Sequence, residues 1–318
     1  MRKVKVIAAC ILLCSIEQTE GSIEKRPSYE TSECHHILEQ IFHSIENLVT
    51  IANEEQGHII SLAIKKKVYP FEFIALLLAK GVRIFPEELV LHDALDSGYS
   101  VDQLGFLIKN GGNLHLLADD GTPLLHRIIK DEKLEVPFEF IKFLIEKRGA
   151  NVDAVDGQGR SLLHIIAEGN INVDVLDLTY LLFKNGANVN AVDEAGNTPL
   201  HLALIANDFP ELAENFIYHD RVNLDIQGMN GETPLHIATL MRKRTLAEML
   251  IERGANMDIL DGNRETPLHI AIRMGKRELA EMLIERGANM DIPDGNGETA
   301  RNKIEALGWI IFAESPIF

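Results

Sequence analysis

The feature of this sequence that most constrains its fold is a segment that occurs twice in almost identical form. Residues Glu232–Gly262 and Glu265–Gly295 align at an offset of 33 residues, and 26 of their 31 positions are identical. A fixed period of about 20 to 50 residues is typical of arrays in which one supersecondary unit stacks on the next. The sequence therefore predicts a stack of repeats rather than a chain folded around one closed core.

Histidines mark the same period over a longer stretch of the chain. Successive histidines lie 38, 37, 35 and 33 residues apart, and an asparagine precedes each of them by 13 residues. Asn302 continues the frame a further 33 residues on. The longer intervals predict insertions of a few residues in the earlier repeats. The five histidines are His126, His164, His201, His236 and His269.

Each repeat carries the signals of two helices followed by a turn. A threonine that can cap a helix is followed by a proline at the first helical position, where the missing N–H costs nothing. A second apolar helix ends at a glycine, which readily adopts the left-handed conformation that terminates helices. The next stretch is rich in Gly, Asn and Asp and indicates a hairpin-like turn. The capping threonines are Thr198, Thr233 and Thr266, and the terminating glycines are Gly149, Gly186, Gly254 and Gly287.

Taken together, these residues resemble the ankyrin repeat. The pattern D-x-x-G-x-T-P-L-H-x-A, then two helices and G-A-N-x-D, is clearest in the three C-terminal full repeats and visible in Gly159–Ala167 and Gly121–His126. The resemblance covers residues 115–308 and implies an all-α solenoid of stacked helix-turn-helix units joined by β-hairpin-like turns. In this family the motif histidine bonds to the threonine and to the neighbouring repeat. The resemblance thus implies structural roles for Thr198, Thr233, Thr266, His126, His164, His201, His236 and His269.

Two turn residues depart from the pattern of the other repeats. Arg264 stands in place of the turn glycine, so we expect that hairpin to be strained or reshaped. Gly228 stands in place of the turn aspartate, which removes a hydrogen-bond acceptor. We expect both hairpins to differ locally from their neighbours.

The chain divides into segments of different character. Residues 1–21 read as a signal peptide, 22–56 as a linker and an N-terminal helix, and 57–117 as degenerate ankyrin-like repeats that keep the spacing without the signature. Residues 118–293 hold the clear repeats. Residues 294–318 are expected to form a capping repeat, with Trp309, Ile310 and Phe312 covering the exposed end of the core.

The N-terminus has the pattern of an exported protein. A basic start, Met1–Lys5, precedes an apolar run of 11 residues, Val6–Ile16, which is too short to span a bilayer comfortably. We expect cleavage before Ser22 and a secreted or periplasmic protein. One alternative is a lipid anchor at Cys10, because the preceding residues resemble a bacterial lipoprotein box. Another is an uncleaved anchor or a buried helix.

Charge and motif content narrow the class of function. The net charge of −17 repels nucleic-acid backbones and anionic membranes. Period-matched histidines lie about 10 Å apart in a stacked array, too far to share one metal ion. We therefore expect no cofactor, no catalytic or metal-binding residues, no nucleic-acid partner and no membrane span. The basic group of Arg242–Arg244, Lys276 and Arg277 is interpreted as a solvated turn between helices.

Of the function classes considered, protein binding by a monomeric scaffold is the one that remains. The resemblance implies that partners bind the concave face of hairpin tips and first helices, at positions counted from the motif histidine. The apolar residues among them would form an exposed ridge, unless Ile205, Leu240 and Met241 pack between helices instead. The predicted binding residues are Gln158, Arg160, Glu194, Asn197, Ile205, Met229, Asn230, Glu232, Leu240, Met241, Asn263, Glu265, Arg273 and Met274.

The leader and the repeats together suggest an exported effector that binds a protein. Two alternatives stay open: a periplasmic or surface lipoprotein scaffold, and an enzyme adaptor whose active part lies in residues 22–115.

Overall fold

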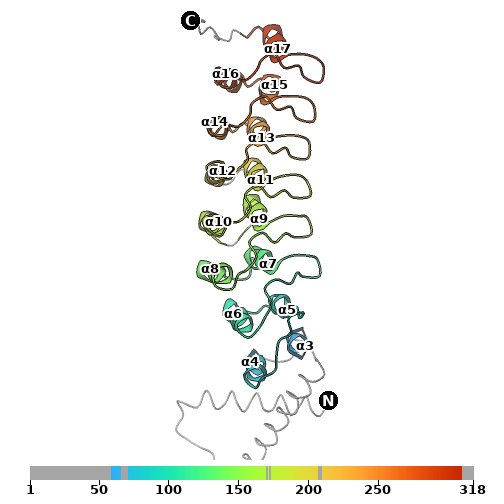
Figure 1. Ribbon diagram of the computed structural model, residues 1–318, viewed down its shortest axis with the longest axis vertical. Helices are drawn as coiled ribbons and strands as arrows, with labels where there is room; N and C mark the ends of the chain where they lie inside the picture. Colours follow the sequence, from blue (N-terminus) through green and yellow to red (C-terminus); the bar gives the residue numbers. More distant parts are fainter. Residues whose placement is uncertain (1–58, 66–70, 170, 172, 207–209, 310–318) are drawn as a thin grey trace, which may run out of the picture. The chain divides into compact units, whose positions relative to one another are not determined.

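The computed structural model describes residues 59–65, 71–169, 171, 173–206 and 210–309 of the chain (Figure 1). Over these residues the chain forms helices joined by turns, and β-structure is limited to isolated bridges such as Val155–Ser161 and Pro293–Thr299. The predicted all-α class is therefore confirmed. The chain divides into two compact units, residues 1–119 and 120–318. The signal peptide, the N-terminal helix, Ile310 and Phe312 lie outside the described residues.

The first unit contains helices α3 (Ile59–Lys65), α4 (Phe71–Ala79), α5 (Val90–Asp96) and α6 (Val101–Lys109). Helix α3 packs on α4 and α5, and α5 packs on α6. Polar contacts also join these elements. Buried Asp93 accepts a hydrogen bond from Ser61 Oγ at 2.5 Å and lies 3.4 Å from Lys65 Nζ. His92 Nε2 donates to the carbonyl of Leu116 at 2.9 Å, which fixes the loop that follows α6.

The second unit alternates two kinds of helix, which form two parallel columns with the hairpin loops projecting beside the first column (Figure 1). The first-column helices are α7 (Leu124–Lys130), α9 (Leu162–Glu168), α11 (Pro199–Ile205), α13 (Pro234–Leu240), α15 (Pro267–Arg273) and α17 (Ala300–Ala306). The second-column helices are α8 (Phe138–Glu146), α10 (Val175–Lys184), α12 (Pro210–Ile217), α14 (Arg244–Glu252) and α16 (Arg277–Glu285).

The two columns differ in how much of each helix is buried. In α13 every residue from Pro234 to Thr239 is buried, because the helix has neighbours on most sides. In α14 only Leu246, Ala247 and Leu250 are buried, which leaves one apolar stripe on a charged helix. The core therefore lies around the first column, and the second column covers it as a set of amphipathic helices.

A periodic asparagine such as Asn256 takes part in two hydrogen bonds, one to the preceding repeat and one within its own turn. The backbone N–H of Asn256 donates to Asp225 Oδ1 of the preceding repeat at 2.8 Å, and Asn289 repeats this contact with Asp258 at 2.9 Å. The asparagine side chain meanwhile accepts from the backbone two residues on, as Asn256 does from Asp258 at 2.9 Å. Each unit is thus tied to its neighbour outside the apolar core.

Adjacent hairpins also touch through their backbones. Gly262 N–H donates to the carbonyl of Asn230 at 2.7 Å. A Cβ atom on Gly262 would lie 2.6 Å from that oxygen, which no real side chain tolerates without movement. Glycine at this position is therefore needed for the close approach of the two hairpins.

The two exceptional hairpins keep their shape by different means. Arg264 adopts φ 59°, and its N–H still bonds to the carbonyl of Asp261 at 2.9 Å, so this hairpin is strained but not reshaped. At Gly228 the backbone bond to the Glu232 carbonyl persists at 2.8 Å. The side-chain acceptor is missing there, whereas Asp261 Oδ1 accepts from both Asn263 and Glu265. The predicted loss of an acceptor is confirmed.

Candidate protein-binding surface

A threonine–histidine pair positions each hairpin on its first helix. In the second unit His236 Nε2 donates to the carbonyl of Glu265 in the next repeat at 3.1 Å. Because Nε2 carries the proton, Nδ1 is the acceptor, and it receives Thr233 Oγ at 2.8 Å and the Thr233 N–H at 3.1 Å. Thr198 and His201 make the same contacts with Glu232, and Ser161 and His164 with Asn197.

This arrangement requires a neutral imidazole. A proton on Nδ1 would face the Thr233 N–H, so the charged form loses its hydrogen bonds as well as its solvation. Burial lowers the pKa of all five motif histidines, and it lowers that of His126 to about 4. These side chains are accordingly suited to hold the hairpins and poorly suited to exchange protons near neutral pH.

Two repeats depart from this threonine–histidine arrangement. At His126 the helix cap is Pro123, which has neither hydroxyl nor N–H, and Nδ1 has no hydrogen-bond partner among the described residues. At His269, Nδ1 accepts from Thr266, but Nε2 lacks a hydrogen-bond partner of adequate geometry among the described residues. Burial lowers the pKa of His269, and the nearby Glu298 carbonyl opposes this only in part. Asn302 replaces histidine in the following repeat, and its N–H bonds to the capping Thr299.

The predicted binding residues differ in how far they reach solvent. Met229 is 69% exposed, and Ile205 and Met241 are each 41% exposed. The exposed set also includes Gln158, Glu194, Asn230, Asn263 and Arg273. Arg160, Asn197, Glu232, Leu240 and Met274 are half-buried, so the prediction that Leu240 and Met274 face solvent is only partly right. Glu265 is buried at 8% exposure, which corrects its placement on an exposed face.

Ion pairs explain why Arg160 is half-buried and Glu265 is buried. Arg273 forms a salt bridge with Glu265, in which Nε lies 3.0 Å and a second guanidinium nitrogen 2.8 Å from the carboxylate. Arg160 binds Glu168 at 2.8 Å with the charges reversed, and also binds Asp156 at 2.7 Å. Each pair joins the residue four before the motif histidine to the residue four after it. These charged side chains are engaged within their own repeats.

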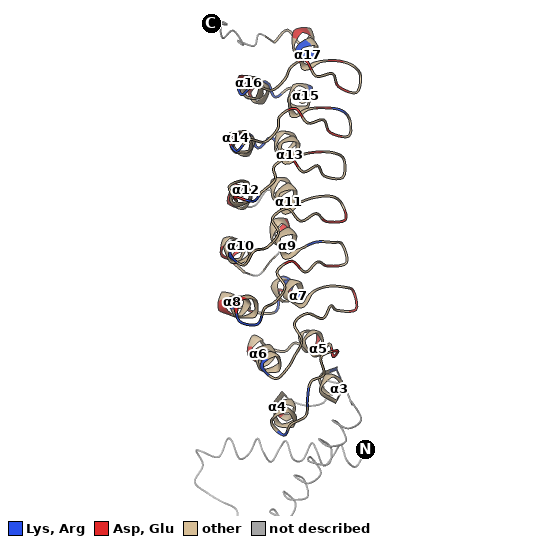
Figure 2. Ribbon diagram, viewed as in Figure 1, with Lys and Arg blue, Asp and Glu red and all other residues tan. Residues whose placement is uncertain are grey.

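In the two repeats between these pairs, the position four residues after the motif histidine is apolar. The positions that hold a charge pair in the outer repeats hold Asn197 and Ile205 in one middle repeat, and Glu232 and Leu240 in the other. Helices α11 and α13 contain no charged residue and are tan throughout Figure 2. The surface therefore has an apolar centre, defined by Ile205, Met229, Leu240 and Met241, between two repeats that carry ion pairs.

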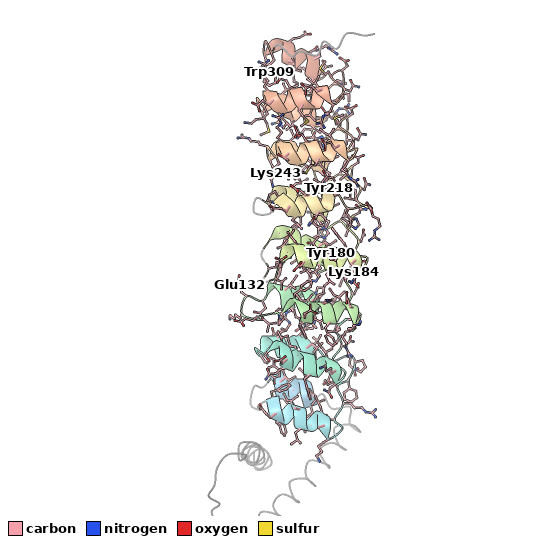
Figure 3. The ribbon with its side chains drawn as sticks, turned by 90° about the vertical axis from the view of Figure 1, so that its left-hand side faces the viewer. Glu132, Tyr180, Lys184, Tyr218, Lys243 and Trp309 are labelled. Atoms are coloured by element: carbon pink, nitrogen blue, oxygen red, sulfur yellow. The ribbon has the colours of Figure 1, made fainter. Side chains whose placement is uncertain are left out.

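Several exposed apolar side chains were missed by the sequence analysis. Val155 and Val192 are 45% and 54% exposed on successive hairpins, in positions just before the turn. On the second column Tyr180 is 71% exposed and Tyr218 50%, and they lie one above the other in Figure 3. Tyr180 aligns with Glu248 and Glu281 of later repeats, and this substitution was a signal available in the sequence.

Other kinds of site find no support in the part of the chain that is described. No group of three or more His, Cys, Asp or Glu residues there is arranged to hold a metal ion. No described helix has the length and apolar character needed to cross a membrane.

Comparisons with known proteins agree with this architecture. The family model described as ankyrin repeats, in three copies, matches residues 136–216, 172–261 and 203–294, which together span half of the chain. A crystal structure of the ankyrin repeat domain of Bcl-3, described as a unique member of the IkappaB protein family, is similar with a TM-score of 0.56. The similarity covers 70% of this chain and 100% of that one at 20% identity, and so concerns the fold. No curated protein matches the sequence.

The family match and the braced helix pairs of the second unit lead to the same conclusion. Ankyrin repeats generally serve as protein-binding scaffolds and are usually not catalytic, and the family match shows no catalytic family. The chain belongs to the ankyrin-repeat family.

Proposed function

We propose that this protein binds a partner protein through the hairpin tips and first helices of its second unit. The observation that carries the proposal is the apolar centre of Ile205, Met229, Leu240 and Met241 between two repeats with internal ion pairs. Apolar residues within a polar rim are the usual anatomy of a protein interface. The three most exposed members are large, and two are methionines, which adapt to the shape of a partner.

The ion pairs give the surface defined limits. Arg160 with Glu168 and Glu265 with Arg273 already have partners, so their charges add little attraction for a second protein. These ion-paired side chains instead form a hydrated rim around the apolar centre, from which a partner can displace water. We therefore place the binding energy on the side chains of α11, α13 and the hairpin that holds Met229.

The rigid support of this centre favours recognition without a change of shape. His201 fixes the hairpin that holds Met229 through a bond to the Glu232 carbonyl, and His236 fixes the next hairpin through a bond to the Glu265 carbonyl. A surface held in this way loses little conformational entropy on binding, which favours affinity.

The test is affinity capture with the full chain and a triple variant, Ile205→Glu, Met229→Glu and Met241→Glu. A matched control, Leu176→Glu, Tyr180→Glu and Tyr218→Glu, adds the same three charges at exposed positions of the second column. We expect a protein retained by the wild type and by the control to be lost at least tenfold by the triple variant, as for a hot spot.

Circular dichroism of both variants separates loss of binding from loss of fold. If the folded triple variant captures the same protein as the wild type, the proposed surface is wrong. If the second-column variant loses it instead, the partner binds around Tyr180 and Tyr218.

Export is a separate proposal, supported by the sequence of residues 1–21 alone. The basic start and short apolar run favour cleavage before Ser22 and action outside the producing cell as an effector. N-terminal sequencing of the protein recovered from outside the cell should begin at Ser22. A chain that begins at a fatty-acylated Cys10 would instead support the lipoprotein alternative.

A further inference from the structure

A hollow lies between the two nearly identical repeats, where each first helix turns into its second helix. Its volume is about 390 Å³. Arg242 and Arg244 line it from the turn between α13 and α14, and residues 275–279 line it from the turn and start of α16. Both repeats therefore contribute to this hollow, which is distinct from the hairpin tips.

The lining is strongly cationic for a chain of net charge −17. It contains Arg242, Arg244, Lys276 and Arg277 against a single acid, Glu278. Arg244 is paired with Glu248 and Glu278, both at 3.3 Å, and Arg277 is paired with Glu281 at 2.7 Å. Within the described residues no ion pair or side-chain hydrogen bond involves Arg242 or Lys276. Two positive charges of the hollow are thus left without a partner.

Only one of the two nearly identical repeats carries an arginine at this turn position. Arg242 stands where the second copy has Gly275, and both adopt a left-handed conformation, with φ 60° and 67°. This conformation is costly for arginine and free for glycine. No ion pair or side-chain hydrogen bond of Arg242 within the described residues offsets that cost. Strained residues of this kind are concentrated at functional sites.

The equivalent lysines also differ between the copies. Lys243 donates a hydrogen bond to the carbonyl of Ala206 at the end of α11. Lys276 occupies the same position one repeat later without such a bond, and it lies in the lining of the hollow. Lys276 is also the cap of α16 and provides no side-chain acceptor, so the first amides of that helix add to the positive field.

We propose that this hollow binds a dianionic phosphate group, carried either by a small phosphorylated molecule or by a phosphorylated side chain. Its charge of nearly −2 at neutral pH matches the two unpaired cations, and arginine presents a fork of donors to its oxygens. A nucleic acid fits less well, because an extended polyanion meets the acidic remainder of the chain. A compact phosphate lies within the screening distance of about 8 Å and responds to the hollow alone.

The test uses the full chain at an ionic strength of about 0.15 M, where the screening distance of about 8 Å applies. It is titrated with inorganic phosphate and with a short neutral peptide that contains one phosphoserine. The same peptide without phosphate and an equal ionic strength of chloride are the reference titrations. Binding is followed by calorimetry and by NMR shifts of the arginine side chains. We expect the two phosphate ligands to bind and Arg242→Gly or Lys276→Gln to weaken them about tenfold.

Arg264→Gly is the matched control. It also removes one positive charge from a left-handed arginine, at φ 59°, and it lies on a hairpin outside the hollow. Unchanged binding in this variant, with the loss in Arg242→Gly and Lys276→Gln, would support the site. Stronger binding of the phosphopeptide than of inorganic phosphate would identify a side chain as the source, and equal binding a free anion.

The proposal is overturned if neither phosphate ligand binds, or if all variants bind as the wild type does. It is also overturned if Arg264→Gly weakens binding as much as Arg242→Gly, because the effect would then reflect net charge. None of these outcomes depends on the proposed protein partner, so the two proposals stand or fall separately.

Discussion

The two nearly identical repeats show which positions of an ankyrin unit are free to diverge. The copies Glu232–Gly262 and Glu265–Gly295 share the cap, the motif histidine and the apolar stripe of the second helix. They differ at five positions: Thr239 and Ile272, Leu240 and Arg273, Arg242 and Gly275, Thr245 and Glu278, and Leu260 and Pro293. Only the first of these pairs is buried in both copies.

One of these differences changes the environment of an identical residue. Glu265 is buried at 8% exposure because Arg273 reaches across the first helix to bind it. Glu232 has the same place in the first copy, but Leu240 stands where that arginine would be, and Glu232 stays half-buried. A single substitution thus converts an ion-paired rim into part of an apolar centre. Function can diverge between the copies while the stack is preserved.

The largest effect is expected from the feature that both copies share, the neutral histidine. Burial lowers the pKa of His126, His164, His201, His236 and His269 below the unfolded value of about 6.5. The unfolded chain then binds more protons, so the histidines contribute stability that is fully present above pH 6.5 and lost as the pH falls toward each folded pKa. With a pKa of about 4, His126 alone should lose about 2 kcal/mol by pH 5.

Urea unfolding at several pH values between 7 and 5 measures this loss. His236→Gln and His269→Gln should each flatten the dependence, since burial is the main cause of the lowered pKa at both histidines. Asp294 is a useful contrast, because Lys303 lowers its pKa to about 2 and its contribution is lost only below pH 3.8. A free energy of unfolding that stays constant from pH 7 to 5 would contradict the conclusion that the motif histidines are neutral in the folded state.

The next effect tests the contact between hairpins. Gly262→Val would place Cβ 2.6 Å from the carbonyl oxygen of Asn230, and Gly295→Val would place it 2.8 Å from that of Asn263. We expect each variant to lose about 2 to 3 kcal/mol, because a backbone atom cannot move aside cheaply. Thermal and urea unfolding would measure both, with Asn263→Ala as an exposed control. Wild-type stability in both variants would show that the hairpins can separate.

The fold was predictable because its signals are local and periodic. The start of α13 is predicted by Thr233, Pro234 and His236, and the end of α14 by Gly254. Neither prediction requires knowledge of distant contacts. The exposure of Ile205, Met229 and Met241 followed from counting positions within the repeat. The boundaries proposed for residues 57–117, and the roles of the binding residues, stay predictions.

What could not be predicted depends on side chains that meet across a helix. Arg160 and Glu168 are eight residues apart, and nothing local shows that they touch. The half-burial of Leu240 and Met274 depends on packing that position counting ignores. The proposed phosphate site is formed by two turns from different repeats. The basic residues of either turn, taken alone, are typical of a solvent-exposed turn between helices. Tyr180 lies on a second helix, whereas the repeat positions that predict the binding surface lie on the hairpins and first helices.

The smallest effect tests whether the two copies are interchangeable in their cores. Thr239 is fully buried and its hydroxyl donates to the Leu235 carbonyl at 2.8 Å, whereas Ile272 fills the same position with methyl groups. Ile272→Thr should cost about 1 kcal/mol, because apolar area is lost while the hydroxyl can bond to its own helix. Thr239→Ile should gain less than that, since its surroundings are packed around a smaller side chain.

Urea unfolding of the two single variants and of the double swap would measure these terms. Equal and opposite changes that cancel in the double swap would mean that the copies have identical cores, and that selection acts only on their surfaces. A double swap less stable than the sum of its parts would mean that positions 239 and 272 are coupled to each other. In that case the cores of adjacent repeats are not independent, and each copy has diverged in the context of its neighbour.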